Sequence, residues 1–172
     1  MIYLMIVLVI LTRFIPHMPD FSPVYGTLLF AGARLRKRDS IWFPVLLLAA
    51  SDLVLTRFFY HSRIGWEQPT QIAAFAAIAM IGWMLRKRFT VGRLGLACLA
   101  APTAFYLISD FGSWLENYPR TWQGLIACYV AAIPFQGRIF ASTAVFAGIL
   151  FGLQHLYAAR AHRERHSHAI VR

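Results

Sequence analysis

Charged residues are scarce in this sequence, and acidic residues are the scarcest. Asp and Glu together number 7 of 172 residues, against 17 Lys and Arg, and only 14% of the chain is charged. Soluble domains carry about 25% charged residues, so the composition argues against a soluble globular domain. With 59% hydrophobic residues and a net charge of +10, the chain has the composition of an integral membrane protein.

Cysteines and familiar catalytic motifs are also nearly absent. The two cysteines, Cys98 and Cys128, are too few for a disulfide framework and lack the paired spacing of a metal site. The chain has no Walker A sequence, no G-x-G-x-x-G, no H-E-x-x-H and no G-x-S-x-G. These absences argue against nucleotide binding and against the common hydrolytic mechanisms, and we expect no tightly bound cofactor.

The basic residues lie between long apolar runs and divide unequally between their two ends. Three clusters hold 12 of the 17: Arg34, Arg36, Lys37, Arg38; Arg86, Lys87, Arg88, Arg93; Arg160, Arg163, Arg165, Arg172. Because cytoplasmic loops hold the excess of Lys and Arg, six membrane spans with both termini in the cytoplasm place every cluster inside. The cations punctuate apolar segments and form no continuous stripe, so the predicted counter-charge is anionic lipid and not nucleic acid.

The predicted fold is all-α, an integral membrane bundle of six transmembrane helices. The spans are residues 1–15, 24–35, 41–58, 69–85, 94–115 and 138–159. Residues 1–159 then form one transmembrane domain, followed by a basic cytoplasmic tail, 160–172. The apolar stretch 122–133 is only about 12 residues long, short of the roughly 20 that cross a bilayer, and predicts a short interfacial or re-entrant helix. A seventh crossing is the alternative, and it would put the tail outside.

Asp52 is a carboxylate inside an apolar segment. An ionisable residue in a membrane is costly and usually faces a cavity or a partner. Asp52 is therefore a ligand-contacting or proton-accepting group, one half of a structural ion pair with Arg57 or Arg138, or a carboxylate close enough to the outer interface to be hydrated.

Asp110 lies in a second apolar segment. Helical spacing places it on one face with Tyr106 and Trp114. That face is either the wall of a binding pocket or an interfacial aromatic belt with a hydrated carboxylate.

Other polar candidates are predicted at the outer side. His17 and Asp20 lie between prolines, and the histidine is either a metal ligand, a hydrogen-bond partner or an ordinary loop residue. Tyr118 and Trp122 lie in an outer loop that suits recognition or anchoring equally well. The histidines of the tail, by contrast, fit a solvated segment, since no carboxylate or cysteine completes a site.

Several of these segments together resemble a known family. The segments are Pro16-His17-Met18-Pro19-Asp20-Phe21-Ser22-Pro23, Leu29-Phe30-Ala31-Gly32-Ala33, Ser51-Asp52-Leu53, Asp110-Phe111-Gly112-x-Trp114, Tyr118-Pro119-Arg120-Thr121 and the run from Gly124 to Phe135. They follow the pattern of a group of small bacterial membrane proteins of unknown function, over about residues 13–152. These proteins resemble the S components of energy-coupling factor vitamin transporters, in which a Pro-Phe loop likewise introduces the sixth helix.

The resemblance implies a six-helix fold in the bacterial inner membrane with an outward-facing pocket. Its substrate-binding candidates in this chain are His17, Asp20, Asp52, Asp110, Trp114, Tyr118 and Arg138. The nearest functional relative it implies is the solitary cobalamin-uptake S component, which makes cobalamin or a related corrinoid the expected substrate. The chain has no cysteine near residues 60–71, where that relative has its cobalt ligand, which leaves His17 or Cys128 for the role.

Three functional readings follow. The first is a binding protein that takes up a vitamin-like small molecule, acting alone or with an energising module, and it is preferred over an enzyme. The second is an enzyme that modifies a corrinoid-like ligand through Cys128 or His17. The third is a non-catalytic membrane partner or assembly protein with no small ligand. The first span lacks the Ala-x-x-x-Ala by which typical S components contact their transmembrane partner, and this favours a solitary protein.

The uptake reading makes a prediction for Asp52. Asp52→Ala is expected to abolish solute uptake into cells and to leave expression intact, because the change removes a polar contact inside the membrane and no large apolar side chain. Uptake by cells that express the variant is the measurement, and unchanged uptake would remove Asp52 from the site.

Overall fold

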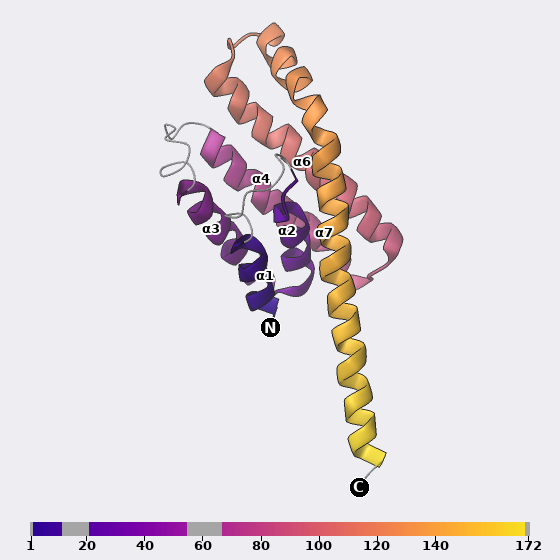
Figure 1. Ribbon diagram of the computed structural model, residues 1–172. Helices are drawn as coiled ribbons and strands as arrows, with labels where there is room; N and C mark the ends of the chain where they lie inside the picture. Colours follow the sequence, from indigo (N-terminus) through magenta and orange to yellow (C-terminus); the bar gives the residue numbers. More distant parts are fainter. Residues whose placement is uncertain (1, 12–20, 55–66, 171–172) are drawn as a thin grey trace.

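The described residues of a computed structural model form an all-helical bundle (Figure 1). They are 2–11, 21–54 and 67–170, with main chain only for 5, 8, 10, 52 and 161–170. The helices are α1 (Ile2–Leu11), α2 (Val24–Arg34), α3 (Asp39–Val54), α4 (Glu67–Gly82), α5 (Met84–Lys87), α6 (Val91–Asn117) and α7 (Trp122–Ile170). Every regular element within these ranges is helical, which confirms the predicted class.

The long helices alternate in direction, so the two termini lie at the same end of the molecule (Figure 1). The α2–α3 turn and the α5–α6 turn lie at that end, each within one of the basic clusters. Helix α7 passes these turns and continues beyond them with Arg160, Arg163 and Arg165 (Figure 1). We call this end of the bundle the basic end. The α6–α7 connection lies at the opposite end, which we call the hairpin end.

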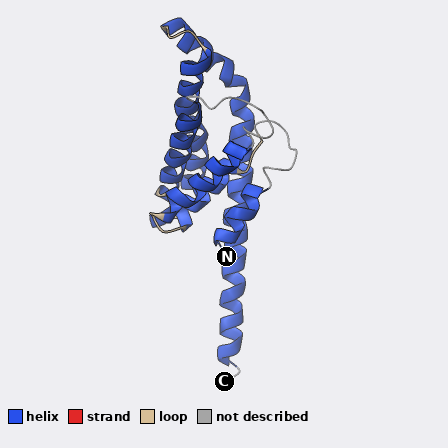
Figure 2. Cartoon of the chain, turned by 90° about the vertical axis from the view of Figure 1, so that its left-hand side faces the viewer, coloured by secondary structure: helices blue, strands red, loops and turns tan. Residues whose placement is uncertain are grey.

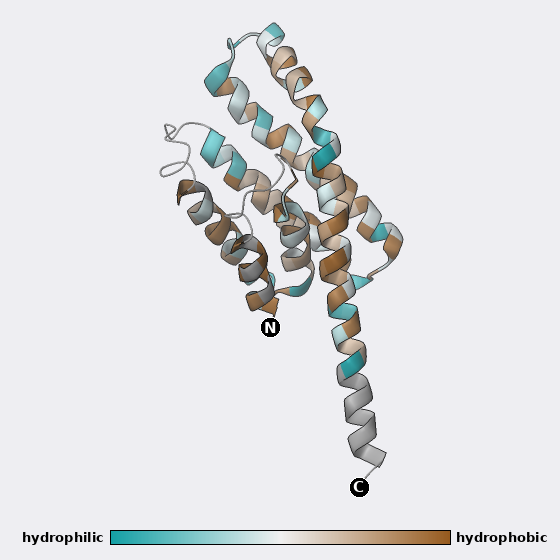
Figure 3. Ribbon diagram, viewed as in Figure 1, coloured by the Kyte–Doolittle hydropathy of each residue, from teal (hydrophilic) through white to brown (hydrophobic). Residues whose placement is uncertain are grey.

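Three helical stretches are long and apolar enough to cross a membrane. They are Glu67–Lys87, Val91–Asn117 and Trp122–Arg160, of 21, 27 and 39 residues. At 1.5 Å per residue the second is about 40 Å long, which exceeds a hydrocarbon core of about 30 Å. Figure 3 shows the apolar residues along the middle of these helices and polar ones toward the hairpin end. These helices indicate a membrane protein.

Helix α2 occupies the centre of the bundle. Its residues from Val24 to Ala33 are all buried, and it packs on α1, α3, α4, α6 and α7. A helix that is apolar all round has no face for water and belongs inside a larger assembly. Phe30 and Leu28 have no exposed surface, and Phe30 packs edge-on against Phe151 of α7. With 11 residues, α2 is only about 16 Å long, and its neighbours enclose it entirely.

Glycines allow α2 to approach its neighbours backbone to backbone. A Cβ at Gly32 would lie against the carbonyl of Ala79 and 2.9 Å from the Cα of Gly82 in α4. A Cβ at Gly26 would lie 2.7 Å from the main-chain nitrogen of Ala147 in α7. Small residues at such crossings let helices pack closely where lipid supplies no hydrophobic driving force between them.

The chain from residue 122 onward differs from the prediction. A short helix over 122–133 followed by a separate last span was expected, but α7 runs as one helix of 49 residues from Trp122 to Ile170. Pro134 lies inside it. A proline removes only one main-chain hydrogen bond from a helix and clashes with one carbonyl, and packing on α6 offsets that cost. The helix also continues into the predicted tail, and Figure 2 shows it extending well past the rest of the bundle.

The α2–α4 contact makes a prediction about stability. Gly32→Ala is expected to lower the free energy of unfolding by about 1–3 kcal/mol, because the new methyl group meets main-chain atoms of Ala79 and Gly82, which cannot rotate away. Thermal unfolding in detergent is the measurement. The matched control is Gly95→Ala in α6, where no atom lies within 4 Å of the added carbon, and an equal loss in both variants would contradict the close contact.

Candidate functional site

The hairpin end is built by a tight connection between α6 and α7. The Trp114 indole N–H donates to the carbonyl of Pro119 at 3.0 Å. The Thr121 hydroxyl accepts from the main-chain N–H of Gly124 at 3.1 Å, as an N-cap does. A Cβ at Gly124 would collide with the Pro119 carbonyl, so only glycine fits at the first turn of α7. The loop is therefore a defined structure that sets the register of the two helices.

Two tyrosines link α6 to α7 through hydrogen bonds, further from the loop along both helices. The Tyr106 hydroxyl donates to the carbonyl of Tyr129 at 2.8 Å, and the Tyr129 hydroxyl donates to the carbonyl of Leu107 at 2.7 Å. Their rings meet edge-to-face with centroids 5.2 Å apart. Each hydroxyl thus bonds to the main chain of the other helix. These two bonds fix both tyrosine rings close to the next turn of α6.

Asp110 lies in that next turn. Its side chain is partly buried, and one carboxyl oxygen, Oδ2, is fully buried with no hydrogen-bond partner among the described residues. Buried polar atoms are nearly always hydrogen-bonded, and an acidic group inside a membrane usually faces a partner or a cavity. Asp110 therefore has one buried acceptor oxygen that receives no hydrogen bond from the described part of the protein.

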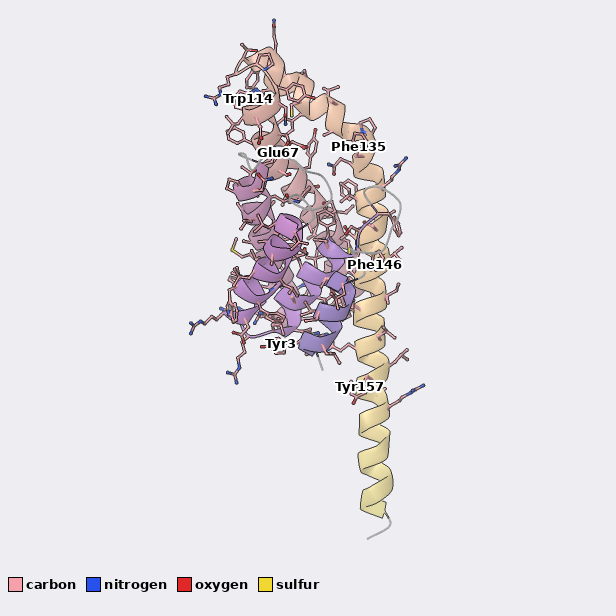
Figure 4. All side chains as sticks on the ribbon, turned by 60° about the vertical axis from the view of Figure 1, so that its left-hand side comes forward. Tyr3, Glu67, Trp114, Phe135, Phe146 and Tyr157 are labelled. Carbon is pink, nitrogen blue, oxygen red and sulfur yellow. The ribbon has the colours of Figure 1, made fainter. Side chains whose placement is uncertain are left out.

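A pair of carboxylates, Glu67 and Glu116, lies where α4 begins, close to the end of α6. The main-chain N–H of Glu67 donates to Oε2 of Glu116 at 3.2 Å, and the Asn117 amide donates to Oε1 of Glu67 at 2.8 Å. A Cβ at Gly112 would collide with the Thr70 hydroxyl, so α4 and α6 also approach closely here. Figure 4 shows Glu67 and Trp114 together at this end, with Tyr3 at the other.

The arrangement is rich in hydrogen-bond acceptors and aromatic surface. Three carboxylates come from α4 and α6, and two tyrosine rings come from α6 and α7. Within the described ranges no group of three or more His, Cys, Asp or Glu residues could hold a metal ion. The chemistry available is recognition of a small molecule that offers hydrogen-bond donors or positive charge.

Cys128 is part of the α6–α7 interface. It is 4% exposed, and its thiol donates to the main-chain carbonyl of Asp110 at 3.4 Å. A cobalt ion bound to this sulfur would have to displace that contact. In this geometry Cys128 packs between α6 and α7.

The structure brings some of the predicted residues together and leaves others apart. Asp110 and Trp114 lie on neighbouring turns of α6, and Tyr118 ends that helix. Arg138 is exposed within α7 and does not lie at a helix end. Asp52 lies in α3, with only its main chain described, and His17 and Asp20 lie outside the described residues.

Sequence reasoning missed Tyr129, Glu67, Glu116 and Asn117. Tyr129 lies in the stretch interpreted as an interfacial helix, which was not paired with α6. Glu67, Glu116 and Asn117 lie just outside the predicted spans 69–85 and 94–115. An antiparallel hairpin about 118–121 would have placed Tyr129 beside Tyr106, and its signal is the mostly apolar stretch from 122 through 150, which Gln136 and Arg138 interrupt.

The sequence was compared with protein families, curated proteins and solved structures. A family of unknown function, DUF6580, matches it over residues 1–166. The chain belongs to this family. No curated protein and no solved structure matches it.

The tyrosine pair makes a prediction. Tyr106→Phe and Tyr129→Phe are each expected to lower the free energy of unfolding by about 0.5–1.5 kcal/mol, because each removes one hydrogen bond between α6 and α7. Thermal unfolding in detergent checks both. Tyr157→Phe is the control, since Tyr157 is 56% exposed on α7 beyond the bundle. An effect at Tyr157 as large as at the pair would contradict the assignment.

Proposed function

We propose that the protein is a multi-pass protein of the bacterial inner membrane that binds a vitamin-like small molecule for uptake. The solute enters at the hairpin end and is released at the basic end. The orientation follows from the positive-inside rule, since the described basic clusters share one end. Six crossings with both termini in the cytoplasm and a fold like that of the S components belong to this proposal.

The observation that supports it best is the buried carboxyl oxygen of Asp110. An acceptor that loses water and finds no donor is destabilised by about 1–3 kcal/mol. A solute that reaches this oxygen after a change in the packing of α6 and α7, and supplies a donor, removes this penalty. Part of its binding energy then comes from satisfying Asp110. Purely structural intramembrane carboxylates would be paired within the protein.

The neighbouring groups fit a bound organic molecule. The edges and faces of Tyr106 and Tyr129 supply aromatic surface, and Glu67 and Glu116 supply further acceptors at the rim. His17, Asp20, Asp52, Trp114, Tyr118 and Arg138 remain proposed contacts, of which Trp114 already uses its indole N–H in the loop. Cobalamin or a related corrinoid is the first solute to test, on the resemblance to vitamin-transport S components.

The same chain has no nucleotide-binding motif. An ATP-driven step, if uptake uses one, therefore belongs to another protein, and the chain itself supplies binding and passage. Release inward needs only a change in the packing of α6 and α7 against the other helices.

Native mass spectrometry of the detergent-purified protein, with and without a panel of vitamins including cobalamins, tests the proposal. One compound is expected to give a retained or added mass. Asp110→Asn is expected to weaken that adduct at least tenfold, because the amide presents an N–H where the solute presents its own donor. Asp39→Asn at the basic end is the matched control and is expected to bind normally.

Two results would count against the proposal. If no compound gives an adduct although a cooperative thermal transition shows that the protein is folded, the protein is better explained as a membrane partner without a ligand. An adduct that survives Asp110→Asn unchanged would keep a binding function but remove Asp110 from the site.

A further inference from the structure

The two basic turns lie side by side because an arginine joins them. Arg86 of α5 donates from Nε to the carbonyl of Gly32 at 2.8 Å and from Nη2 to the carbonyl of Leu35 at 2.6 Å. These carbonyls end α2 and have no helical partner of their own. Trp83 adds a further link through its indole N–H to the Ser40 hydroxyl at 3.0 Å.

This arrangement gathers positive charge with almost no compensation. Eight Lys and Arg side chains come from residues 34–41 and 83–93, and the sole acidic residue of these two segments is Asp39. Its carboxylate already accepts from the Tyr3 hydroxyl at 2.8 Å and from the Trp42 indole N–H at 3.2 Å. The cations therefore have little internal counter-charge.

Some of these cationic side chains contact other groups of the protein, and others are exposed. Arg86 holds main-chain carbonyls, the Arg34 guanidinium lies over the rings of Phe89 and Phe151, and the Lys37 ammonium lies over Trp83. Arg36 and Arg38, in the α2–α3 turn, are exposed. Their charges face outward at the level where helices leave the membrane.

A shallow hollow of about 520 Å³, largely open to the surroundings, lies beside Arg38 and is lined by Arg38, Ile41 and Trp42. One wall is a guanidinium and the others are an aliphatic side chain and an indole, and Trp42 is 47% exposed. The hollow thus combines a cation with apolar surface in the first turn of α3. Tryptophan at this level is typical of the boundary between hydrocarbon and headgroups.

We propose that this hollow binds the headgroup of an anionic phospholipid of the cytoplasmic leaflet. The phosphate pairs with Arg38, and the glycerol and upper acyl carbons lie against Ile41 and Trp42. Anionic lipids attract clusters of Lys and Arg immediately beside membrane helices, and a guanidinium holds phosphate oxygens in a bidentate pair. The inference does not depend on the proposed solute, whose site is at the other end.

Apolar surface among the cations favours a lipid over an acidic protein or a nucleic acid. Met84, Phe89 and Val91, at the neighbouring α5–α6 turn, are 47%, 42% and 82% exposed. A water-soluble polyanion would contact the cations but would not cover these apolar side chains. At a membrane interface they lie among acyl chains while the neighbouring cations reach the phosphates.

Native mass spectrometry of the delipidated full chain tests the site, with phosphatidylglycerol and phosphatidylcholine of identical chains as the probes. Phosphatidylglycerol is expected to bind at least fivefold more tightly, since each cation near the surface contributes roughly that factor. Arg38→Gln is expected to remove the preference. Arg36→Gln, which changes the same charge in the same turn outside the hollow, is the matched control and is expected to keep it.

A second measurement reports on position. Brominated phosphatidylglycerol is expected to quench tryptophan fluorescence in the wild type and distinctly less in Trp42→Phe, whereas inorganic phosphate at equal concentration is expected not to displace the lipid. Equal binding of the two lipids would overturn the proposal. If Arg36→Gln lost the preference for phosphatidylglycerol as fully as Arg38→Gln, the lipid would be held by the overall positive charge and not by the hollow. That result would also overturn the proposal. Thermal unfolding of each variant confirms that it is folded.

Discussion

The contact between Gly32 of α2 and Gly82 of α4 is the constraint on which the rest of the bundle depends. It brings two helix backbones together with no side chain between them. A short helix can be enclosed on all sides only if its neighbours approach this closely. Once α2 is fixed against α4, the positions of α6 and α7 follow, because α6 packs on α4 and α7 packs on α2.

The same central helix links the two ends of the molecule. Its last carbonyls accept from Arg86, which holds the basic turns together. Near its first turn, Phe21 packs on Phe146 of α7, with ring centroids 5.8 Å apart. Tyr25 of α2 packs on Phe105 of α6, one residue before the tyrosine that clasps α7. The candidate site and the basic end therefore depend on one common element at the core.

Much of the fold could be predicted from the sequence. Apolar runs and basic clusters predicted the helical segments from 24 to 117 within a few residues of those observed, because long hydrophobic periods and charge at their ends are local signals. The stretch 122–133 was mispredicted because its length alone fits no span. What makes it part of a long helix is packing on α6, through Tyr129 and Cys128, and no local pattern contains that information.

The candidate site was predictable to a similar degree. Asp110 was identified because a carboxylate among apolar residues is conspicuous. Glu67 and Glu116 were not identified, because they are far apart in the sequence. Only the packing of α4 on α6 brings them together. Trp114 was predicted as a stacking surface, and the structure shows that its indole also closes the loop at Pro119. Residues that stand out in their own segment could be identified from the sequence. Residues that matter through a contact between two helices could not.

The length of α7 has a mechanical consequence. Its 49 residues form a rod of about 74 Å that begins at the hairpin and ends far beyond the basic turns, as Figures 1 and 2 show. Because a helix transmits tilt along its whole length, a small rotation of the hairpin moves the distal end through a much larger arc. Pro134, about a quarter of the way along, is a natural fulcrum. Because α7 also packs on α2 through the close approach of Gly26 to Ala147 and through Phe30 on Phe151, such a tilt shifts the contacts of the central helix as well.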